Sequence, residues 1–599
     1  MQNPLGRRWI TSRLPRPWLQ DHSPTIVPQT GPKIPPPLPP SVLWTLAQLR
    51  RSRPHWGWGL SAALLSPIAA ASVLPRPSLA QDSIGPAGVN AAILHQPPYN
   101  LTGRKIAIGQ VELGRPGLFG FDKVDDRNLA LRPWGLFFRD QPARSASPSD
   151  PLDIPEVDGH AHKVASVMVS RDKTLHGVAP NARLYSAAIG SLQTSGQPQE
   201  CRTTNHVALQ NGGDVRAINF SFGESLARDP RPNAQLDGNA LLTLCVDWSA
   251  RVHDVVYVVA GNQGEGGIPI PTDNYNGINV AFSTRWQGVF QKLDFANVGG
   301  ELASVADRQV GRERNLNQRR SIDLAAPGSK LELLTLQGEG AVSSGTSFAA
   351  PHVTAAVAVL QEYGDRQLAA KTPGWTIAAR RHEVTKAVLL NSADKIKDSG
   401  SGEFLAMERT LRNHRNRTWL ESPAYSRSDL PLDATMGAGH LNVWRAYQQF
   451  SAGPGQPDRP VEARGWDYNQ VGLDSATPPY RDYILAQPLQ AGSHVALTLN
   501  WDRWVELDDR NGNGEYDIGE EFRNLGLNNL DLFLLPLEAT DSTAAVAASV
   551  SSVDSTEHIF ATVPRSGQYK IRVQYQTQTH QPTQSYGLAW WTQPQGMPQ

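Results

Sequence analysis

Apolar residues follow two different spacings along this chain, and the change falls near residue 450. Before it, short apolar runs such as 105–111 and 255–260 have the β-branched composition of buried strands. Helical spacing, with apolar residues every three to four positions, recurs at 160–170, 239–251, 346–360 and 384–390. Strands that alternate with helices predict an α/β fold built on a doubly wound parallel sheet, in which ligands bind beyond the carboxyl ends of the strands.

Beyond residue 450 the spacing becomes that of short strands separated by turns. Alternating apolar positions occur at 495–499, 530–535, 559–563 and 569–575. Such a series predicts a C-terminal β-sandwich. Glycine and proline are frequent in 451–465, which is typical of a linker. We therefore predict an α/β domain over 81–450 and a β-sandwich over 466–599, and we expect the polar, arginine-rich stretch 398–434 at the surface.

Residues 1–80 do not have the pattern of a folded domain. Residues 13–40 are rich in proline and lack periodicity, as expected of a disordered segment. Three arginines then precede an apolar stretch at 56–74, and Ser78-Leu79-Ala80 resembles a signal-peptidase site. We expect a cleaved signal peptide and a secreted or periplasmic protein. The alternative is a membrane anchor, but polar residues interrupt the stretch, which is barely long enough to span a bilayer.

Composition excludes some partners and leaves others open. The chain has 56 Lys and Arg residues and 56 Asp and Glu residues, so its formal net charge is zero. It contains no basic stripe of the kind that would indicate nucleic-acid binding. No glycine-rich phosphate loop follows a strand, so we expect no organic cofactor. The two cysteines, Cys201 and Cys245, form either one disulfide in an oxidising compartment or two buried thiols. The oligomeric state is not indicated.

One serine lies at the start of the apolar helix predicted at 346–360. It is Ser347, within the string SGTSFAAPHV at 344–353. Unpaired backbone N–H groups and the positive end of the helix dipole favour developing negative charge at this place, which suits a nucleophile in acyl transfer. Taken alone, Gly-Thr-Ser is better explained as a helix N-cap.

A histidine motif precedes this serine. The string DGHAHKVAS at 158–166 contains His160 and His162, and HGVAPNARLY at 176–185 follows it. A His-Ala-His pair can also indicate a metal site, but no cysteine or acidic residue at zinc spacing supports one. Together with the serine string, these motifs resemble those of the subtilisin-like serine peptidases, in the same order along the chain. The resemblance implies that Ser347 is the nucleophile and His160 the general base.

The resemblance also implies residues that bind the substrate. The apolar run at 255–260 leads into Gly261-Asn262, where turn chemistry alone would explain an asparagine. By resemblance, Asn262 donates a hydrogen bond to the oxyanion beside the N–H of Ser347. Ser221, Phe222 and Gly223 follow a strand similar to the one whose edge pairs with an extended substrate, so their backbone is expected to bind a polypeptide.

The acidic member of the triad departs from the family's pattern. The strand at 105–111 is followed by Glu112-Leu113-Gly114, where most of the family would have an aspartate. Glutamate can orient His160 and stabilise its cation if the backbone is set back to make room for the extra methylene. The alternatives are a solvated Glu112 or a replacement acid among Asp122, Asp125 and Asp126. Glutamate at this strand end also resembles the sedolisins, but those peptidases replace the histidine by glutamate and the asparagine by aspartate.

These residues predict an exported serine endopeptidase that hydrolyses peptide bonds through an acyl-enzyme, with Glu112, His160 and Ser347 as its triad. Polypeptides are the expected substrates, and the sequence does not indicate a side-chain preference. The alternative is a catalytically inactive protein of the same fold that acts by binding or adhesion.

A calcium-loop pattern lies within the predicted sandwich. The string DRNGNGEYDIGE at 509–520 matches the twelve-residue loop at every defined position. The oxygen ligands for Ca²⁺ would come from Asp509, Asn511, Asn513, the Glu515 carbonyl, Asp517 and Glu520. The flanks have strand spacing and not helix spacing, so no EF-hand switch is predicted. The alternative is an Asn-Gly hairpin turn with solvated acids.

Overall fold

A computed structural model describes residues 83–122, 128–145, 156–191, 195–262, 269–286, 288–293, 314–473 and 478–596. The predicted leader and signal peptide lie outside the described residues, as do Asp125 and Asp126. All described residues belong to one compact unit that spans 75–599. Within them, no helix is both long enough and apolar enough to cross a membrane.

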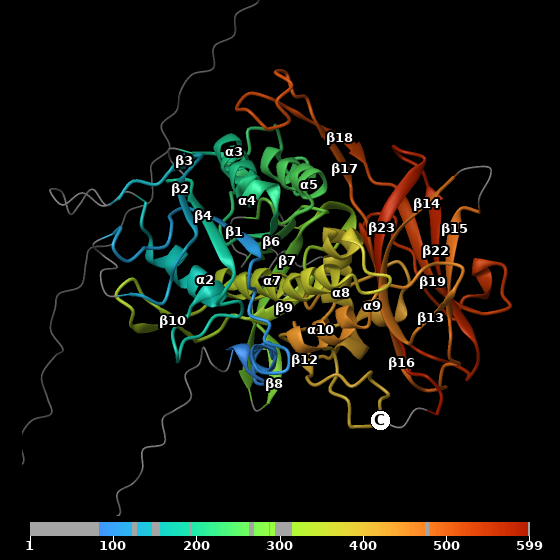
Figure 1. The fold of residues 1–599 in the computed structure, drawn as a ribbon. Coiled ribbons are helices and arrows are strands. Elements are labelled where there is room, and N and C mark those ends of the chain that lie inside the picture. Colours follow the sequence, from blue (N-terminus) through green and yellow to red (C-terminus); the bar gives the residue numbers. More distant parts are fainter. Residues whose placement is uncertain are drawn as a thin grey trace, which may run out of the picture. The chain divides into compact units, whose positions relative to one another are not determined.

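The α/β region is built on a ten-stranded sheet with the order β12-β8-β7-β6-β5-β1-β4-β2-β3, in which β9 also pairs with β7. Its strands are β1 (Ala107–Glu112), β2 (Gly135–Phe138), β3 (Gln141–Pro142), β4 (Arg183–Ala188), β5 (Val215–Phe220), β6 (Val256–Ala260), β7 (Ile278–Trp286), β8 (Val289–Lys292), β9 (Leu324–Pro327) and β12 (Leu411–Arg412). The six neighbours from β7 to β2 are parallel. Strand β1 lies between β4 and β5, so the chain order reverses there (Figure 1). A reversal of this kind opens a crevice beyond the carboxyl ends of the strands.

Helices cover both faces of this sheet, as the alternation of strands and helices predicts. One face carries α2 (Gly159–Val169), α7 (Thr346–Ala370), α8 (His382–Asn391) and α10 (Val443–Ser451), and the other carries α3 (Gln197–Ala208) and α5 (Leu241–His253). The short helices α4 (Gln210–Gly213) and α9 (Pro423–Ser426) and the hairpin β10 (Leu331–Leu334) and β11 (Gly340–Ser343) lie outside these layers. A disulfide joins Cys201 of α3 to Cys245 of α5.

Side chains of β1 alternate between the two faces, and this alternation places the polar residues of the strand. Ala107 and Val111 pack in the apolar cluster around α3 and α5, whereas Ile108 packs in the cluster around α2 and α7. Because successive side chains of a strand point to opposite faces, Gln110 and Glu112 share the face of Ile108 and point toward α2.

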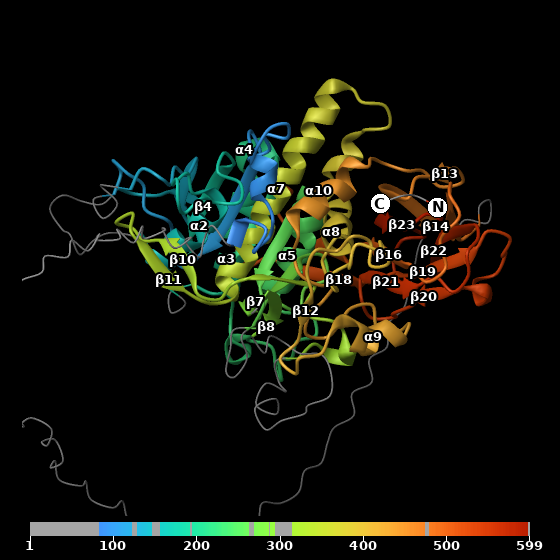
Figure 2. The ribbon, with the colours of Figure 1, turned by 90° about the horizontal axis from the view of Figure 1, so that it is seen from below.

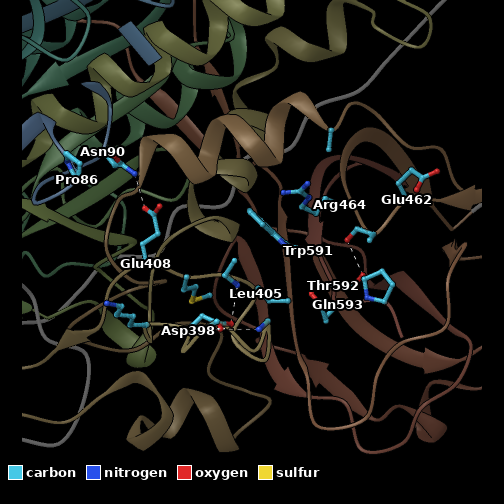
Figure 3. Close-up of a pocket in the computed structure, with 18 residues that line it drawn as sticks. Pro86, Asn90, Asp398, Leu405, Glu408, Glu462, Arg464, Trp591, Thr592 and Gln593 are labelled. Carbon is cyan, nitrogen blue, oxygen red and sulfur yellow. Dashed lines mark hydrogen bonds between the residues drawn. The ribbon is translucent and has the colours of Figure 1, made fainter. Parts of the chain in front are cut away.

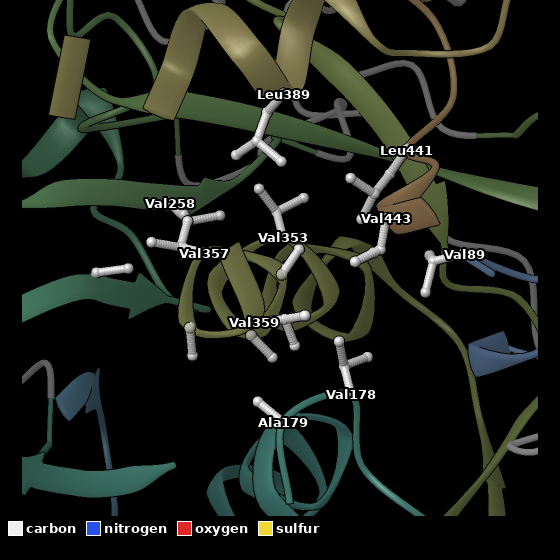
Figure 4. Packing of buried hydrophobic residues seen from close by; sticks show 14 of the residues in the cluster. Val89, Val178, Ala179, Val258, Val353, Val357, Val359, Leu389, Leu441 and Val443 are labelled. Atoms are coloured by element: carbon white, nitrogen blue, oxygen red, sulfur yellow. The ribbon is translucent and has the colours of Figure 1, made fainter. Parts of the chain in front are cut away.

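Helix α7 forms the centre of the larger apolar core. Its Val353, Val357 and Val359 are fully buried, and they lie among Val258 of β6, Leu389 of α8 and residues of the loops around them (Figure 4). A helix that is apolar on nearly all sides is stable only when it is surrounded in this way. The rigid core therefore fixes the position of the N-terminal turn of α7, where Ser347 lies.

The C-terminal region is a β-sandwich, as predicted. One sheet has the order β13-β15-β22-β19-β20 and the other β14-β23-β16-β21 (Figure 2). The strands are β13 (Pro460–Val461), β14 (Arg464–Gly472), β15 (Tyr480–Leu485), β16 (His494–Asn500), β19 (Asn529–Pro536), β20 (Ala547–Ser549), β21 (Thr556–Thr562), β22 (Tyr569–Thr577) and β23 (Thr583–Trp591). Leu497, Leu532, Ile571 and Trp590 are among the side chains that fill the space between the sheets. A separate hairpin, β17 (Trp504–Leu507) and β18 (Phe522–Gly526), carries the loop at 509–520.

The sandwich packs directly on the α/β region through its four-stranded sheet. Strands β16 and β23 lie against α8, and the approach is so close that a Cβ on Gly587 would come within 2.4 Å of the backbone of Glu383. Only glycine fits where two backbones approach this closely. The boundaries at 450 and 465 stay predictions.

The stretch 398–434 differs from the expected surface segment. Leu405, Met407, Leu411 and Trp419 are almost fully buried, in a cluster that also contains Phe560 of the sandwich. Most of this stretch is exposed or partly exposed, as expected, but a sparse set of large apolar residues among its arginines fixes it to the core.

Candidate active site

Glu112 and His160 meet at the carboxyl edge of the sheet. Glu112 is the last residue of β1, and His160 is the second residue of α2. The Nδ1 atom of His160 lies 3.1 Å from Oε2 of Glu112. The Glu112 side chain is 2% exposed, whereas the His160 side chain is 40% exposed and can reach a substrate. This geometry matches an acid that orients a catalytic base.

A close backbone contact sets the distance between β1 and α2. A Cβ on Gly114 would come within 2.3 Å of the Cβ of Asp158, so this position requires glycine. Asp158 is the N-cap of α2, and its side chain accepts a hydrogen bond from the N–H of Ala161 at 2.9 Å. The N–H of Asp158 donates to the carbonyl of Arg115 at 2.9 Å. The glycine in Glu-Leu-Gly therefore lets the first turn of α2 lie against the end of β1.

The electrostatics of the pair favour a proton on His160. Burial raises the pKa of Glu112, while the charge of His160 opposes this rise. Burial lowers the pKa of His160, but the Glu112 carboxylate outweighs this effect and raises that pKa above its ordinary value of 6.5. A carboxylate that stabilises the imidazolium is what general-base catalysis requires of the third triad member.

Ser347 lies in the first turn of α7, after the N-cap Gly345. Its hydroxyl donates to the carbonyl of Ser221 at 3.4 Å and not to His160. The hydroxyl of Ser221 in turn donates to the carbonyl of Ser347 at 2.9 Å. The ring of Phe348, the next residue, lies 5.4 Å from the His160 ring between centroids. The residue that follows the serine thus lies beside the histidine ring, and catalytic hydrogen bonds are often long or unformed before a substrate binds.

The predicted substrate-binding residues share this edge of the sheet. Val111 of β1 pairs with Phe220 of β5, which pairs with Val259 of β6. Glu112 and Ser221 therefore lie at the same level on adjacent strands. Asn262, which is 2% exposed, follows two residues after the end of β6. Phe222 and Gly223 are buried just beyond Ser221.

The alternative acids and the alternative metal pair have other partners. Asp122 forms two hydrogen bonds with the guanidinium of Arg115, at 2.7 and 2.8 Å. His162 contacts Asn128 at 2.9 Å, and burial lowers its pKa to about 4. Glu112 is therefore the carboxylate that the described residues bring to His160, and the two histidines do not face a common ligand.

Two polar residues that support the site were missed in the sequence. The amide of Gln110 donates to the carbonyl of Ala161 at 2.9 Å and so holds the first turn of α2. The amide of Asn219 donates to the hydroxyl of Ser221 at 2.8 Å. Each is a fully buried polar residue in a largely apolar strand, and this pattern could have revealed both.

The loop at 509–520 has the turns of a cation-binding loop. The Asp509 carboxylate accepts from the N–H groups of Gly512 and Gly514, at 2.7 and 2.8 Å. Glu520 accepts from the N–H of Arg510 and of Asp517, each at 2.9 Å. Gly514 has a φ of 77°, as the sharp turn requires. The carboxylates are oriented by the loop, and its donor set is rich in the oxygen atoms that Ca²⁺ prefers.

A cavity of about 930 Å³ lies away from these residues. Figure 3 shows it between the segment around Asp398 and Glu408 and the end of β23 at Trp591. None of the predicted catalytic residues lines it. Its size therefore carries no information about the catalytic edge of the sheet.

Comparison with known proteins places part of the chain in a family. Residues 137–415 match the model of the subtilase family, peptidase S8. This range includes His160, Asn262 and Ser347 but begins after Glu112, so the role of Glu112 depends on the geometry alone. Subtilisin NAT of Bacillus subtilis subsp. natto is 26% identical over 51% of this chain and 66% of its own length. An alkaline protease of Alkalihalobacillus alcalophilus is 25% identical over 40% of this chain and 52% of its own length. The chain thus spans about half to two thirds of these relatives.

Solved structures of lower similarity also align. A crystal structure of MycP1 without its N-terminal propeptide is 18% identical, with a TM-score of 0.37, and covers 62% of this chain and 96% of that one. A cold-adapted subtilisin-like serine proteinase is 19% identical, with a TM-score of 0.32, over 52% of this chain and 89% of that one. The family match carries the most weight: residues 137–415 match the subtilase family, so this part of the chain is similar to the subtilisin-like serine peptidases.

Proposed function

We propose that this chain is an exported serine endopeptidase that hydrolyses peptide bonds through an acyl-enzyme. The observation that supports this most directly is the buried Glu112 carboxylate on Nδ1 of the half-exposed His160, beside the N-terminal turn of α7. Because Nδ1 bonds to Glu112, the Nε2 atom is the nitrogen left for the hydroxyl of Ser347.

The reaction follows from these positions. Ser347 Oγ attacks the substrate carbonyl while His160 Nε2 takes the hydroxyl proton, and the Glu112 carboxylate stabilises the resulting imidazolium. The amide of Asn262 and the N–H of Ser347 stabilise the oxyanion. His160 then protonates the leaving amine. A water molecule attacks the acyl-enzyme by the same steps in reverse and restores the serine.

The contacts of Ser347 without a substrate suggest how substrate binding starts the reaction. Ser347 donates its hydroxyl hydrogen to the Ser221 carbonyl, which is also an expected acceptor for an N–H of an extended substrate. A bound polypeptide would therefore take this acceptor and release the hydroxyl toward His160. The substrate class that this arrangement favours is an unfolded or extended polypeptide segment.

The test of the proposed activity is covalent labelling. The purified protein should react with a serine-directed fluorophosphonate and cleave casein. Ser347→Ala should abolish labelling and reduce turnover by about 10⁶, because the triad acts as a unit. Ser344→Ala is the matched control, since this exposed serine bonds only to the N–H of Lys330 in the adjacent turn. A folded wild-type protein that is neither labelled nor active would favour a binding or adhesion role.

We also propose that the loop at 509–520 binds Ca²⁺ through Asp509, Asn511, Asn513, the Glu515 carbonyl, Asp517 and Glu520. The residue types fit calcium, because they supply only oxygen ligands with several negative charges. The ion would stabilise the β17–β18 hairpin.

Thermal unfolding of the full chain tests whether this loop binds Ca²⁺. The chain carries Ser347→Ala so that it does not cleave itself. Calcium at 100 times its Kd should stabilise the fold by about 2.7 kcal/mol through mass action. Asp509→Ala with Glu520→Ala should remove this increment. Equal melting temperatures in calcium and in EGTA for the parent protein would contradict the site.

A further inference from the structure

A second cluster of titratable side chains lies where the sandwich meets α8. His382 and Glu383 are the first residues of α8, and Asp254 is the C-cap of α5. Asp502 belongs to the sandwich and lies between β16 and β17. His382, Glu383 and Asp502 are 2%, 4% and 8% exposed, respectively. Neither the subtilase motifs nor the proposed calcium loop includes any of these four residues.

One nitrogen of His382 faces two carboxylates. Its Nδ1 atom lies 2.8 Å from Oδ1 of Asp254 and 3.2 Å from Oε2 of Glu383. These three atoms lie within 4.8 Å of one another, and no other trio of His, Cys, Asp or Glu donor atoms among the described residues converges in this way. The other nitrogen, Nε2, lies 3.0 Å from Oδ1 of Asp502.

The arrangement leaves one buried oxygen without a hydrogen-bond donor. Nδ1 can carry only one hydrogen, and it donates that hydrogen to Oδ1 of Asp254. Glu383 Oε2 is buried and accepts no hydrogen bond. An anionic oxygen that accepts no hydrogen bond in the interior is costly even with a histidine nitrogen 3.2 Å away, so a cation between the two carboxylates and the ring would stabilise the cluster.

Arg381 orients the two carboxylates toward the histidine. Its guanidinium lies 3.4 Å from Oδ2 of Asp254 and 3.4 Å from Oε1 of Glu383. The outer oxygen of each carboxylate is thereby engaged, and the inner oxygens, Oδ1 and Oε2, face Nδ1. This is the orientation that metal ligands need from their surroundings.

We propose that Asp254, His382 and Glu383 bind a divalent first-row transition-metal ion, with Zn²⁺ as the best fit. The ligands would be Oδ1, Nδ1 and Oε2. Atoms about 2.0 to 2.2 Å from a tetrahedral zinc lie roughly 3.3 to 3.6 Å apart. The two distances from Nδ1, 2.8 and 3.2 Å, are slightly shorter, so small side-chain movements suffice. An imidazole ligand favours zinc over calcium or magnesium.

Asp502 completes this site from the other region of the chain. Metal-bound histidines usually donate their second N–H to a carboxylate, which fixes the tautomer and orients the ring. Here the Nε2–H of His382 donates to Asp502. The ion therefore joins α5 to α8 directly, and it connects both to the sandwich through Asp502. Asp254, the most exposed ligand at 28%, leaves a route for the ion and for a water as fourth ligand.

The competing occupant is a proton. Without a metal, His382 would be an imidazolium among three carboxylates, whose negative charge it and Arg381 offset only in part. The two occupants differ in a simple observable, because only one of them adds a heavy atom. This proposal does not depend on peptidase activity.

Metal content and anomalous scattering distinguish the two. The full chain with Ser347→Ala is equilibrated with Zn²⁺ and passed through a desalting column, and its zinc is measured by mass spectrometry. Crystals of the same protein are measured on both sides of the zinc absorption edge. We expect an anomalous peak about 2.0 to 2.2 Å from the three ligand atoms.

Variants separate this ion from zinc bound elsewhere. Glu383→Gln keeps the size of the side chain and should lower the bound zinc by one ion per chain. Asp502→Asn should weaken zinc binding by about 10 to 100-fold, as expected for the carboxylate behind a metal-bound histidine. Glu506→Gln is the matched control, because this carboxylate lies on nearby β17 but pairs with Arg523. Its zinc content should equal that of the parent.

The result that would overturn the proposal is a parent crystal without anomalous density at the cluster. Equal zinc in the parent and in Glu383→Gln would overturn it as well. If Glu383→Gln does not fold, the anomalous measurement on the parent decides alone.

Discussion

His160 and His382 both contact buried carboxylates, yet their surroundings suit them to different tasks. His160 has one carboxylate, on Nδ1, and its side chain is 40% exposed, so Nε2 is available for chemistry. His382 has carboxylates at both nitrogens and is 2% exposed. An imidazole that can exchange its proton with a substrate serves as a base, whereas one whose two nitrogens are both engaged can only hold structure together.

The position of each histidine on its helix adds to this difference. Each lies in the first turn of a helix, where the first backbone N–H groups have no partner within the helix. The turn that carries His160 lies at the carboxyl edge of the sheet, whereas the turn that carries His382 is covered by β23. The same local structure thus gives an exposed histidine in one case and a buried one in the other.

Among changes to the carboxylates that face the two histidines, the largest effect should come from removing the charge of Glu112. Glu112→Gln keeps the shape but stabilises the wrong tautomer and cannot offset the imidazolium, so turnover at neutral pH should fall by about 10⁴. Glu112→Asp should cost less than the amide, because it keeps the charge but leaves a gap to His160. Both are measured as kcat on a peptide substrate, with circular dichroism to check folding. Full activity of Glu112→Gln would end the assignment of this residue.

The corresponding change at His382 should affect stability and not chemistry. Asp502→Asn leaves a buried cation without one of its carboxylates, and breaking a buried ion pair costs about 3 to 5 kcal/mol. Denaturant unfolding of the full chain with Ser347→Ala measures this loss, and kcat is measured without that substitution at a temperature where the chain is folded. Glu506→Gln should change neither quantity. If Asp502→Asn lowers kcat while stability is unchanged, the contrast between the two histidines is wrong.

The smallest predicted effect is a shift in the pH dependence of activity. The base must be neutral, so kcat/KM should rise as the pH increases through the pKa of His160. Although burial lowers this pKa, the Glu112 carboxylate raises it above 6.5, which places the acidic limb of the wild type above that pH. In Glu112→Gln the raising charge is gone and burial remains, so the limb of the residual activity should move to lower pH by about one unit or more. An unchanged limb would mean that another group titrates.

Motifs that are contiguous in the sequence were sufficient to predict most of the candidate catalytic residues. The strings around His160 and Ser347 each combine a helix start with the reactive side chain, because the chemistry itself uses the N-terminal turn. Glu112 was harder, since the departure from aspartate left Asp122, Asp125 and Asp126 open. Asp122 pairs with Arg115, and Glu112 pairs with His160. The second pairing depends on the close approach of the Gly114 backbone to Asp158, which the sequence does not show.

Apolar spacing shows which face of an element is buried. It was therefore possible to predict the order of strands and helices, the sandwich, and the strands that flank the loop at 509–520. The surface position predicted for 398–434 holds for most of its residues, but its buried apolar residues were missed, since they are few and form no periodic pattern. Gln110 and Asn219 were missed because their roles require partners in other elements.

The sequence by itself determined the fold class and the candidate reactive residues of this protein, since helix starts, strand periods and motif strings are local properties of the chain. Only the tertiary structure decided which carboxylate serves His160 and that Asp254, Glu383 and Asp502 surround His382. The last of these contacts joins residues 120 positions apart, and another joins residues 128 apart. No local pattern encodes such contacts, because burial and charge pairing arise only when separate elements pack together and exclude water.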